Sequence, residues 1–155
     1  HTNDAPSAIT RLMELGVPAY LINATLLGVL AQRLVRTLCP SCKQPDLQFD
    51  LHTLEEAVRP WKINLAEKSC SAYKPVGCVA CRMSGYRGRL GLYELLTVNE
   101  AVRDQIHQKL SLPSLRREAV AAGMRPLRLG GAQRIADGTT TLEEILLATP
   151  APSQG

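Results

Sequence analysis

Cys39-Pro-Ser-Cys42 and Cys78-Val-Ala-Cys81 are the two stretches that organise this 155-residue chain. Two residues between the cysteines let both sulfur atoms of one turn point at a single ion. Two such turns together supply the four ligands of a tetrahedral site, for which zinc is the default ion. The three histidines are scattered, so few other side chains compete for this role. The sequence therefore predicts that Cys39, Cys42, Cys78 and Cys81 bind zinc.

The spacing alone leaves other uses of these cysteines open. A single pair could be a redox dithiol or a disulfide, although neither pair lies within a short βαβ pattern. The same four thiolates could hold an iron–sulfur cluster. The fifth cysteine, Cys70, is expected to be a free thiol because structural zinc sites are four-coordinate. Metal-binding turns require reduced thiols, and no signal peptide or membrane-length apolar run is visible, so we expect a cytosolic protein.

Much of the formal net charge of +4 lies near the cysteines. Zinc with four thiolates carries a net −2, so cations beside it have a structural explanation. Contact with nucleic acid or with an acidic protein surface is the alternative explanation. Only Tyr73 and Tyr86 near this patch could stack on bases, so nucleic acid is not the expected partner. The cations are Arg36, Lys43, Lys74, Arg82, Arg87 and Arg89.

The first part of the chain contains two predicted helices. Asp4 favours a helix start, and Gly16 ends the apolar repeat that follows. Pro18 opens a second predicted helix, which runs to about Thr37 and is apolar around much of its circumference. Such a helix would need burial on more than one side. Because the chain begins at His1, directly before the first helix, we expect it to be a piece of a larger protein.

The segment between the two cysteine pairs is interrupted by prolines and poor in core-forming side chains. It is therefore predicted to be an inserted loop that the metal organises. A short helix is expected from Thr53 to Arg59, and a short strand from Ala72 to Val76. The apolar stretch from Leu90 to Val98 predicts a second strand, in which Glu94 needs a hydrogen-bond partner or water.

The C-terminal part is predicted to be helical. Asn99 caps one predicted helix, and Pro113 starts the next. A third helix is expected from Leu127 to Ala136, weakened by its two adjacent glycines by about 1 kcal/mol each. Thr141 and Glu144 predict a capping box in front of a last apolar run.

No catalytic constellation is visible in the sequence. The chain contains no GxxxxGK[S/T] loop and no Gly-Lys dipeptide, so it cannot cradle a nucleotide β-phosphate in the usual way. The acidic residues belong to helix faces or caps, without a spacing that favours acid–base catalysis. His52 and His107 are expected to be surface residues. The chain by itself is therefore expected to be inactive towards ATP.

Several segments together resemble a known family, the type II secretion and type IV pilus assembly ATPases, in their C-terminal part. These segments are HTNDA (1–5), GVLAQRLVRTLCPSCK (28–43), GCVAC (77–81), GYRGRLGLYELL (85–96) and GTTTLEE (138–144). The resemblance extends over nearly the whole chain.

The resemblance implies a parent protein that is a cytoplasmic homo-hexameric ATPase on the cytoplasmic face of the inner membrane. Its partners would be the inner-membrane platform proteins of the secretion or pilus machine, and its cofactors ATP, magnesium and zinc. His1 matches the histidine box of the family, which implies sensing of the γ-phosphate in the parent protein. Cys39, Cys42, Cys78 and Cys81 match the tetracysteine metal subdomain of the family.

The predicted fold is α+β, mainly α, in three parts. Residues 1–38 are expected to be the C-terminal helices of a RecA-like ATPase core, and residues 39–86 the tetracysteine zinc subdomain. Residues 87–155 are expected to form a return strand and a small C-terminal helical subdomain. A chain of this length can bury one ordinary core, so the metal acts as a local staple.

The predicted function is that of a C-terminal fragment of a secretion or pilus ATPase, carrying a structural zinc and a partner-contact surface. The alternative is a stand-alone zinc module that binds nucleic acid through Arg82, Arg87 and Arg89. Phosphate-driven binding of that kind weakens steeply with added salt. A redox switch that uses Cys70 together with one zinc ligand is a third hypothesis.

Overall fold

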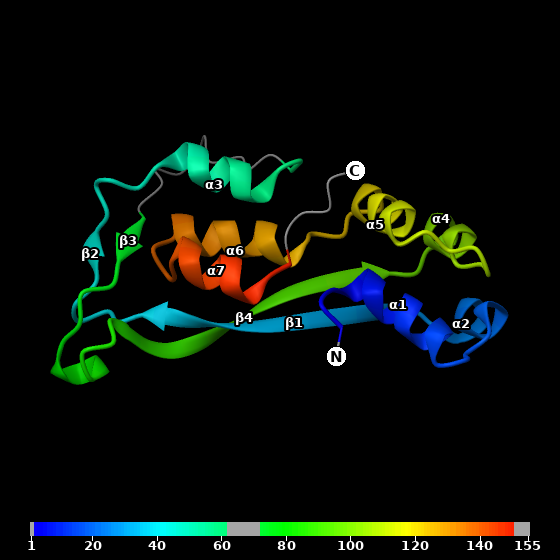
Figure 1. Cartoon of the computed structure of the whole chain (residues 1–155), viewed down its shortest axis with the longest axis horizontal. Coiled ribbons are helices and arrows are strands. Elements are labelled where there is room, and N and C mark those ends of the chain that lie inside the picture. The colour runs from blue at the N-terminus through cyan, green and yellow to red at the C-terminus, as the bar shows by residue number, and fades with distance from the viewer. Residues whose placement is uncertain (1, 62–71, 151–155) are drawn as a thin grey trace. The chain divides into compact units, whose positions relative to one another are not determined.

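The computed structural model describes residues 2–61 and 72–150. Within these residues, seven α-helices and one 3₁₀ turn accompany two small sheets, β1 with β4 and β2 with β3 (Figure 1). The predicted mixture of helix and strand is confirmed. No helix among the described residues has the length and apolarity that a membrane crossing requires. The elements are α1 (Ala5–Glu14), α2 (Ala19–Thr25), β1 (Gly28–Leu38), β2 (Gln44–Pro45), α3 (Leu51–Val58), β3 (Tyr73–Lys74), η1 (Val79–Cys81), β4 (Tyr86–Thr97), α4 (Glu100–Gln105), α5 (Leu112–Ala121), α6 (Leu127–Ala136) and α7 (Leu142–Ala148).

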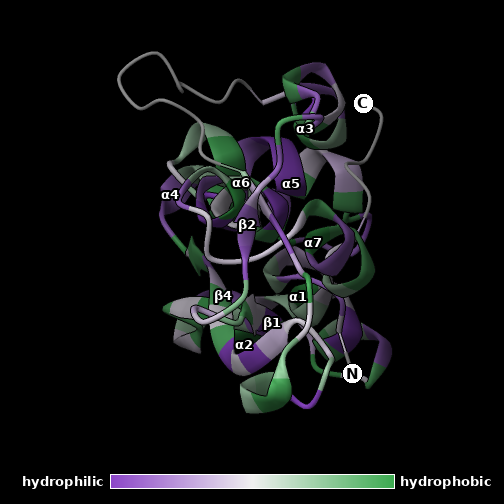
Figure 2. Ribbon diagram, turned by 90° about the vertical axis from the view of Figure 1, so that its left-hand side faces the viewer, coloured by the Kyte–Doolittle hydropathy of each residue, from purple (hydrophilic) through white to green (hydrophobic). Residues whose placement is uncertain are grey.

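Two compact units make up the chain, and β1 and β4 run through both. Unit 1 comprises the described residues 2–32 and 93–127, with α1, α2, α4 and α5. Unit 2 comprises the described residues 33–61, 72–92 and 128–150, with β2, β3, α3, η1, α7 and all but the first residue of α6. Single helices such as α3 and α7 show both green and purple stretches in Figure 2, as expected of helices with one apolar face.

Unit 1 has its own apolar core. α1 begins after Asp4 as predicted, and the Asp4 carboxylate accepts a hydrogen bond from Ser7 N at 2.9 Å. The same carboxylate forms an ion pair with Arg116 at 2.6 Å, which binds α1 to α5. The buried members of this core are Ala5, Ile9, Ile22, Leu96, Val98, Val102, Ile106, Leu115, Ala119 and Met124.

Glu94 is buried in the middle of β4, with 3% of its surface exposed. Its carboxylate accepts hydrogen bonds from Ala5 N at 2.8 Å and from Leu127 N at 3.1 Å. These are the first N–H groups of α1 and α6, which have no partner within their own helices. Burial raises the pKa of Glu94, because desolvation outweighs the two N–H donors. The first backbone N–H groups of α1 and α6 are thus the hydrogen-bond partners that the sequence required for Glu94.

The predicted helix over residues 18–37 is wrong beyond α2. Leu26 is extended, with ψ of 121°, and β1 follows it. Periodicity cannot distinguish an apolar run of this kind from a strand, and pairing with β4 decides the outcome. A Cβ on Gly28 would lie 2.9 Å from Leu96 O, so the two strands approach closely here. The first cysteine pair therefore follows a strand and not a helix. In the apolar run beyond α2, Leu27, Leu30 and Leu34 are exposed, although the predicted helix needed burial on more than one side.

The segment between the cysteine pairs contributes to the interior of unit 2, contrary to the prediction of a core-poor loop. The predicted short helix is present as α3. Leu54 and Val58 on this helix are each 1% exposed. Arg128 Nη1 donates a hydrogen bond to Ala57 O at 3.4 Å, which joins α3 to α6. Two apolar residues four positions apart are a weak signal, which explains why the sequence did not indicate this burial.

The C-terminal helices are confirmed, with one difference in how α7 begins. The Asn99 side chain caps α4 by accepting from Val102 N at 3.0 Å, and Thr141 Oγ1 caps α7 by accepting from Glu144 N at 3.4 Å. The capping box is only half formed. The Glu144 carboxylate accepts hydrogen bonds from Arg36 N and Arg36 Nε, both at 3.0 Å. Arg36 on β1 thus takes the place of the Thr141 backbone N–H as the partner of the Glu144 carboxylate.

α6 contains two adjacent glycines with different surroundings. A Cβ on Gly131 would lie 2.7, 2.8 and 3.1 Å from three side-chain carbons of Ile145, whereas a Cβ on Gly130 would meet nothing within 4 Å. Ile145 is 1% exposed, so it has little room to move. We expect Gly131→Ala to lower the free energy of unfolding by about 1–3 kcal/mol through overpacking. Gly130→Ala should raise it by about 0.5–1 kcal/mol through helix propensity. Urea titration of the two variants measures both changes, and equal effects would contradict this packing.

Candidate metal centre

The four cysteines of the two pairs lie together in unit 2. Cys39, Cys42, Cys78 and Cys81 are free thiols, and their Sγ atoms all lie within 4.8 Å of one another. The Sγ–Sγ distance is 3.9 Å for Cys39–Cys78, 3.9 Å for Cys42–Cys81 and 3.7 Å for Cys78–Cys81. A disulfide requires about 2.05 Å, so these pairs are not bonded. The predicted convergence of the four thiols is confirmed.

These separations fit the edges of a zinc–thiolate tetrahedron. With Zn–S bonds of about 2.3 Å, ideal tetrahedral geometry places neighbouring sulfur atoms about 3.8 Å apart. The three distances of 3.9, 3.9 and 3.7 Å lie close to that value. The side chains present therefore fit a single four-coordinate ion with sulfur at every position.

Backbone hydrogen bonds close each turn around the carbonyl of its first cysteine. Cys39 O accepts from Cys42 N at 3.3 Å and from Lys43 N at 3.0 Å. Cys78 O accepts from Cys81 N at 3.2 Å in the second turn. The local sequence alone is enough to form these turns, because each bond spans three or four residues.

A two-stranded pairing brings the two turns together. β2 directly follows the first turn and β3 precedes the second, and the two strands pair antiparallel. Gln44 lies opposite Lys74 in this pairing. Cys39 N also donates to Gly85 O at 2.9 Å, which links the first turn to the residues after the second. The distance in sequence between the pairs is thus bridged by backbone contacts on both sides of the thiols.

Backbone N–H groups also point at the sulfur atoms. Cys78 N and Gly85 N each donate to Cys81 Sγ at 3.2 Å, and Gly77 N donates to Cys42 Sγ at 3.4 Å. Burial acts to raise the pKa of Cys81, but its N–H donors and the neighbouring thiols outweigh burial and lower the pKa to about 6. Burial dominates at Cys42 and raises its pKa to about 11. N–H groups directed at sulfur stabilise thiolate charge, which metal binding also requires.

Gly77 and Gly85 are residues of this centre whose role sequence reasoning did not identify. Their φ angles are +109° and +75°, a region that favours glycine. A Cβ on Gly77 would lie 2.8 Å from Met83 O, and one on Gly85 would lie 2.4 Å from the Cβ of Pro75. The positions of these two glycines relative to the second cysteine pair are a signal that could have identified them. One glycine immediately precedes the second cysteine pair and the other follows it by four residues.

Two of the cations predicted near the cysteines have structural partners. Lys43 Nζ donates to Gly138 O at 2.7 Å and lies 4.5 Å from the centre of the Tyr73 ring. The Arg36 guanidinium lies 4.2 Å from the centre of the Tyr86 ring. These two side chains therefore have partners of their own in the fold, which are a backbone carbonyl and two aromatic rings.

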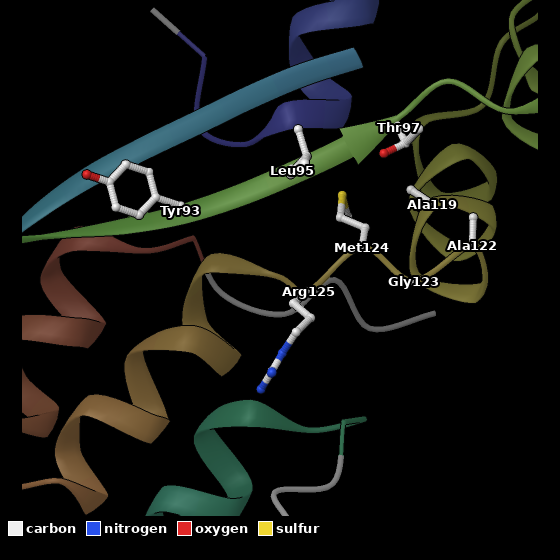
Figure 3. Close-up of a pocket in the computed structure, with 8 residues that line it drawn as sticks. All are labelled: Tyr93, Leu95, Thr97, Ala119, Ala122, Gly123, Met124 and Arg125. Carbon is white, nitrogen blue, oxygen red and sulfur yellow. The ribbon is translucent and has the colours of Figure 1, made fainter. Parts of the chain in front are cut away.

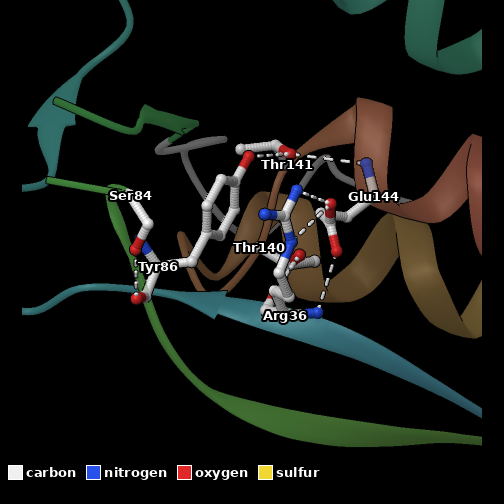
Figure 4. A network of polar contacts seen from close by, with 6 residues as sticks. All are labelled: Arg36, Ser84, Tyr86, Thr140, Thr141 and Glu144. Carbon is white, nitrogen blue, oxygen red and sulfur yellow. Dashed lines mark hydrogen bonds and ion pairs between the residues drawn. The ribbon is translucent and has the colours of Figure 1, made fainter. Parts of the chain in front are cut away.

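The Arg36 side chain belongs to a larger polar network (Figure 4). Hydrogen bonds from Arg36 lower the pKa of Glu144. Thr140 Oγ1 donates to Arg36 O at 2.7 Å, and the hydroxyls of Tyr86 and Thr141 lie 3.0 Å apart. These contacts join α7 to the strands beside the cysteines. The carboxylate is saturated by its arginine partner, so the network is suited to structural support and not to proton transfer.

Two other residues singled out in the sequence, His52 and His107, are not members of this cluster. His1 and Cys70 lie outside the described residues. His52 and His107 are exposed, as predicted for surface histidines. His52 lies 3.9 Å from Glu56, and His107 Nδ1 accepts from Lys109 N at 3.1 Å.

A separate cavity of about 320 Å³ lies within unit 1, between the end of β4 and the end of α5 (Figure 3). Arg125 is its only charged lining residue, and the remaining polar groups are the Tyr93 and Thr97 hydroxyls. This set offers neither a paired acid and base nor a nucleophile with a base. The chemistry of the described residues is therefore concentrated at the cysteines. The lining residues are Tyr93, Leu95, Thr97, Ala119, Ala122, Gly123, Met124 and Arg125.

Comparison with known proteins gives relatives along nearly the whole chain. Residues 1–147 match the family model described as Type II/IV secretion system protein. The chain is 45% identical over 150 residues to the type IV pilus assembly ATPase TfpB of Acinetobacter baylyi, covering 97% of this chain and 25% of that protein. It is 43% identical over 149 residues to the type II secretion system protein HxcR of Pseudomonas aeruginosa, covering 96% and 27%. It is 38% identical over 149 residues to the type II secretion system ATPase E of Vibrio cholerae, covering 96% and 28%.

The chain spans about a quarter of the length of these curated relatives. Their names cover both systems that the sequence segments resembled, type II secretion and type IV pilus assembly. The tetracysteine cluster lies within the matched residues and fits zinc binding. The resemblance stated from the sequence is thereby confirmed, and the chain belongs to the type II/IV secretion system protein family.

Proposed function

We propose that this chain is part of a hexameric ATPase that powers type II secretion or type IV pilus assembly, and that its four cysteines hold a structural zinc. Membership of the family supports the first statement. The observation that carries the second is the set of Sγ–Sγ distances of 3.7 and 3.9 Å. A shell of four sulfur ligands leaves no open position for water, so the zinc would join the two turns and not act as a Lewis acid.

ATP hydrolysis belongs, in this proposal, to the parent protein. This chain lacks a phosphate-binding loop, so ATP and magnesium would be bound by residues outside it. His1 would sense the γ-phosphate there, since an imidazole N–H can donate to a phosphate oxygen. The parent would lie on the cytoplasmic face of the inner membrane and contact the platform proteins of its machine. The identity of 38% or more to relatives named as ATPases of these two systems supports this assignment.

The three parts predicted from the sequence remain our proposal for the parent. Residues 1–38 would end a RecA-like core, with β1 in place of the helix first expected there. Residues 39–86 would form the zinc subdomain, which is supported by the position of both cysteine pairs and of β2 and β3 within this range. Residues 87–155 would form the return strand and the C-terminal helical subdomain.

Metal analysis of the purified chain tests the zinc. Mass spectrometry of the protein is expected to give one zinc per chain, and its absorption spectrum should lack the visible bands of an iron–sulfur cluster. A chelator should remove the zinc and lower the melting temperature. Iron with visible absorption, or no metal in protein purified without chelator, would overturn the assignment. In the same preparation, no phosphate release from ATP is expected, and activity would contradict the placement of the nucleotide site outside this chain.

A further inference from the structure

The part of unit 2 around the cysteines carries a strong positive charge. Residues 33–45 and 72–92 contain seven lysines and arginines and no aspartate or glutamate. Four thiolates on zinc contribute −2 and the Glu144 carboxylate, which pairs with Arg36, contributes −1, so the net charge is about +4. Arg36 and Lys43 have the partners described above. Four other cations are exposed and form no ion pair within the described residues: Lys74, Arg82, Arg87 and Arg89.

Apolar side chains stand at the tip of the second cysteine turn. Val79 is 90% exposed, Met83 is 70% exposed and Val76 is 51% exposed. The backbone beneath them is held in place, because Met83 N donates to Cys78 O at 2.8 Å. Arg82 and Met83 have positive φ angles of 53° and 64°, and the chain makes a turn at these two residues. Exposure of this degree describes a convex tip and not a groove, and Figure 1 draws it as the short green coil at the lower left.

We infer that this tip docks on an anionic membrane surface. We define the tip surface as the exposed apolar and basic side chains of the continuous segment 74–89 that contains the second cysteine turn: Val76, Val79, Met83, Lys74, Arg82, Arg87 and Arg89. A bilayer receives a convex apolar tip without a complementary pocket, and basic side chains around the tip are attracted to anionic headgroups. The inference rests on the proposed zinc centre, since the metal holds the turn that presents these side chains.

Nucleic acid fits the same surface less well. Single-stranded bases bind by stacking on available aromatic rings. Tyr73 and Tyr86, the aromatic residues near the cysteines, already stack against Lys43 and Arg36. The exposed aliphatic side chains Val76, Val79 and Met83 offer nothing to a phosphate backbone. The combination of aliphatic and basic groups therefore favours a lipid surface.

Vesicle co-sedimentation of the zinc-loaded chain tests this inference. The wild type is expected to bind vesicles of equal parts phosphatidylglycerol and phosphatidylcholine at physiological ionic strength, and not vesicles of phosphatidylcholine alone. The double variant Arg87→Gln/Arg89→Gln should bind about 30-fold more weakly, from about 1 kcal/mol per basic residue near an anionic surface. Val79→Ser/Met83→Ser should also weaken binding, by about tenfold, since both side chains lose apolar contact with the bilayer.

Two matched controls remove the same chemistry elsewhere. Arg117 is exposed on α5 and Leu147 is 76% exposed on α7, so Arg117→Gln and Leu147→Ser should leave vesicle binding unchanged. Equal losses in the control and tip variants, or equal binding to neutral vesicles, would overturn the inference. The inference would also be overturned, in favour of nucleic acid, if the wild type bound duplex DNA but not vesicles. In that case the arginine variant would lose the binding to DNA. Zinc content is measured on every sample, so that loss of binding in a zinc-free sample is attributed to the metal centre, and loss of binding in a zinc-loaded tip variant to the tip side chains.

Discussion

Cys39→Ser is expected to lose bound zinc and to unfold the segment from Cys39 to Cys81, while the C-terminal helices remain folded. Cys39 is fully buried, and its sulfur lies 3.9 Å from that of Cys78. Structural zinc contributes about 10–16 kcal/mol in small zinc-finger peptides, which is comparable to the whole stability of a domain. Loss of one thiolate breaks the closed shell that joins the two turns. Mass spectrometry of bound metal, circular dichroism and limited proteolysis measure the three parts of this result.

Cys70→Ser is the matched control, because it makes the same chemical change at the one cysteine that the proposed zinc site does not use. This variant should keep its zinc and the protease resistance of the wild type. Cleavage in Cys39→Ser should concentrate between the two cysteine pairs, while α5, α6 and α7 stay protected. A fully retained metal in Cys39→Ser would count against these ligands. Zinc loss in Cys70→Ser would show that the fifth cysteine takes part in the site.

Glu94→Ala is expected to lower the free energy of unfolding by about 3–5 kcal/mol. The substitution leaves Ala5 N and Leu127 N, which now donate to the carboxylate at 2.8 and 3.1 Å, buried without an acceptor. Each buried donor without a partner costs about 1–3 kcal/mol, and the lost side chain leaves a cavity as well. Urea-induced unfolding followed by circular dichroism measures the change. Leu95→Ala is the matched control, because Leu95 is the next residue of β4 and is 57% exposed. A loss in Glu94→Ala no larger than in this control would refute the role of the carboxylate.

The pH dependence of stability provides a second test of Glu94. Its folded-state pKa is raised above the unfolded value of 4.5 by burial. The folded chain therefore holds a proton that the unfolded chain has released, and the contribution of this group to stability falls as pH rises from 4.5 through the raised pKa. Glu94→Gln does not titrate, so the stability margin of wild type over this variant should shrink as pH rises through that window. A margin that grows with pH would contradict the direction of the shift.

Elements with strong local signals were predicted from the sequence. α1 has an aspartate cap, α6 spans the expected residues, and Thr141 caps α7. Each of these signals depends on residues within one or two turns of the same helix. The same is true of the two cysteine turns, whose hydrogen bonds span three or four residues.

Elements that depend on distant partners were not predicted. Residues 28–38 form a strand because β4 is available to pair with them, although their apolar pattern also suits a helix. The Glu144 carboxylate binds the Arg36 guanidinium instead of the Thr141 backbone N–H of the predicted capping box. A charged donor binds a carboxylate more strongly than a backbone N–H does. The burial of Leu54 and Val58 on α3 likewise depends on neighbours elsewhere in the chain.

The sequence by itself determined which side chains can form the metal site, because two residues between cysteines define a turn whatever surrounds it. It also determined the family, through segments distributed over the chain. Only the tertiary structure decided that the four sulfur atoms lie within 4.8 Å of one another and that glycine N–H groups point at them. It also decided that the Glu94 carboxylate accepts hydrogen bonds from the first N–H groups of α1 and α6. The physical reason is separation along the chain. Most of these contacts join residues that are 33 to 89 positions apart. A local sequence pattern does not indicate which distant group will form the contact.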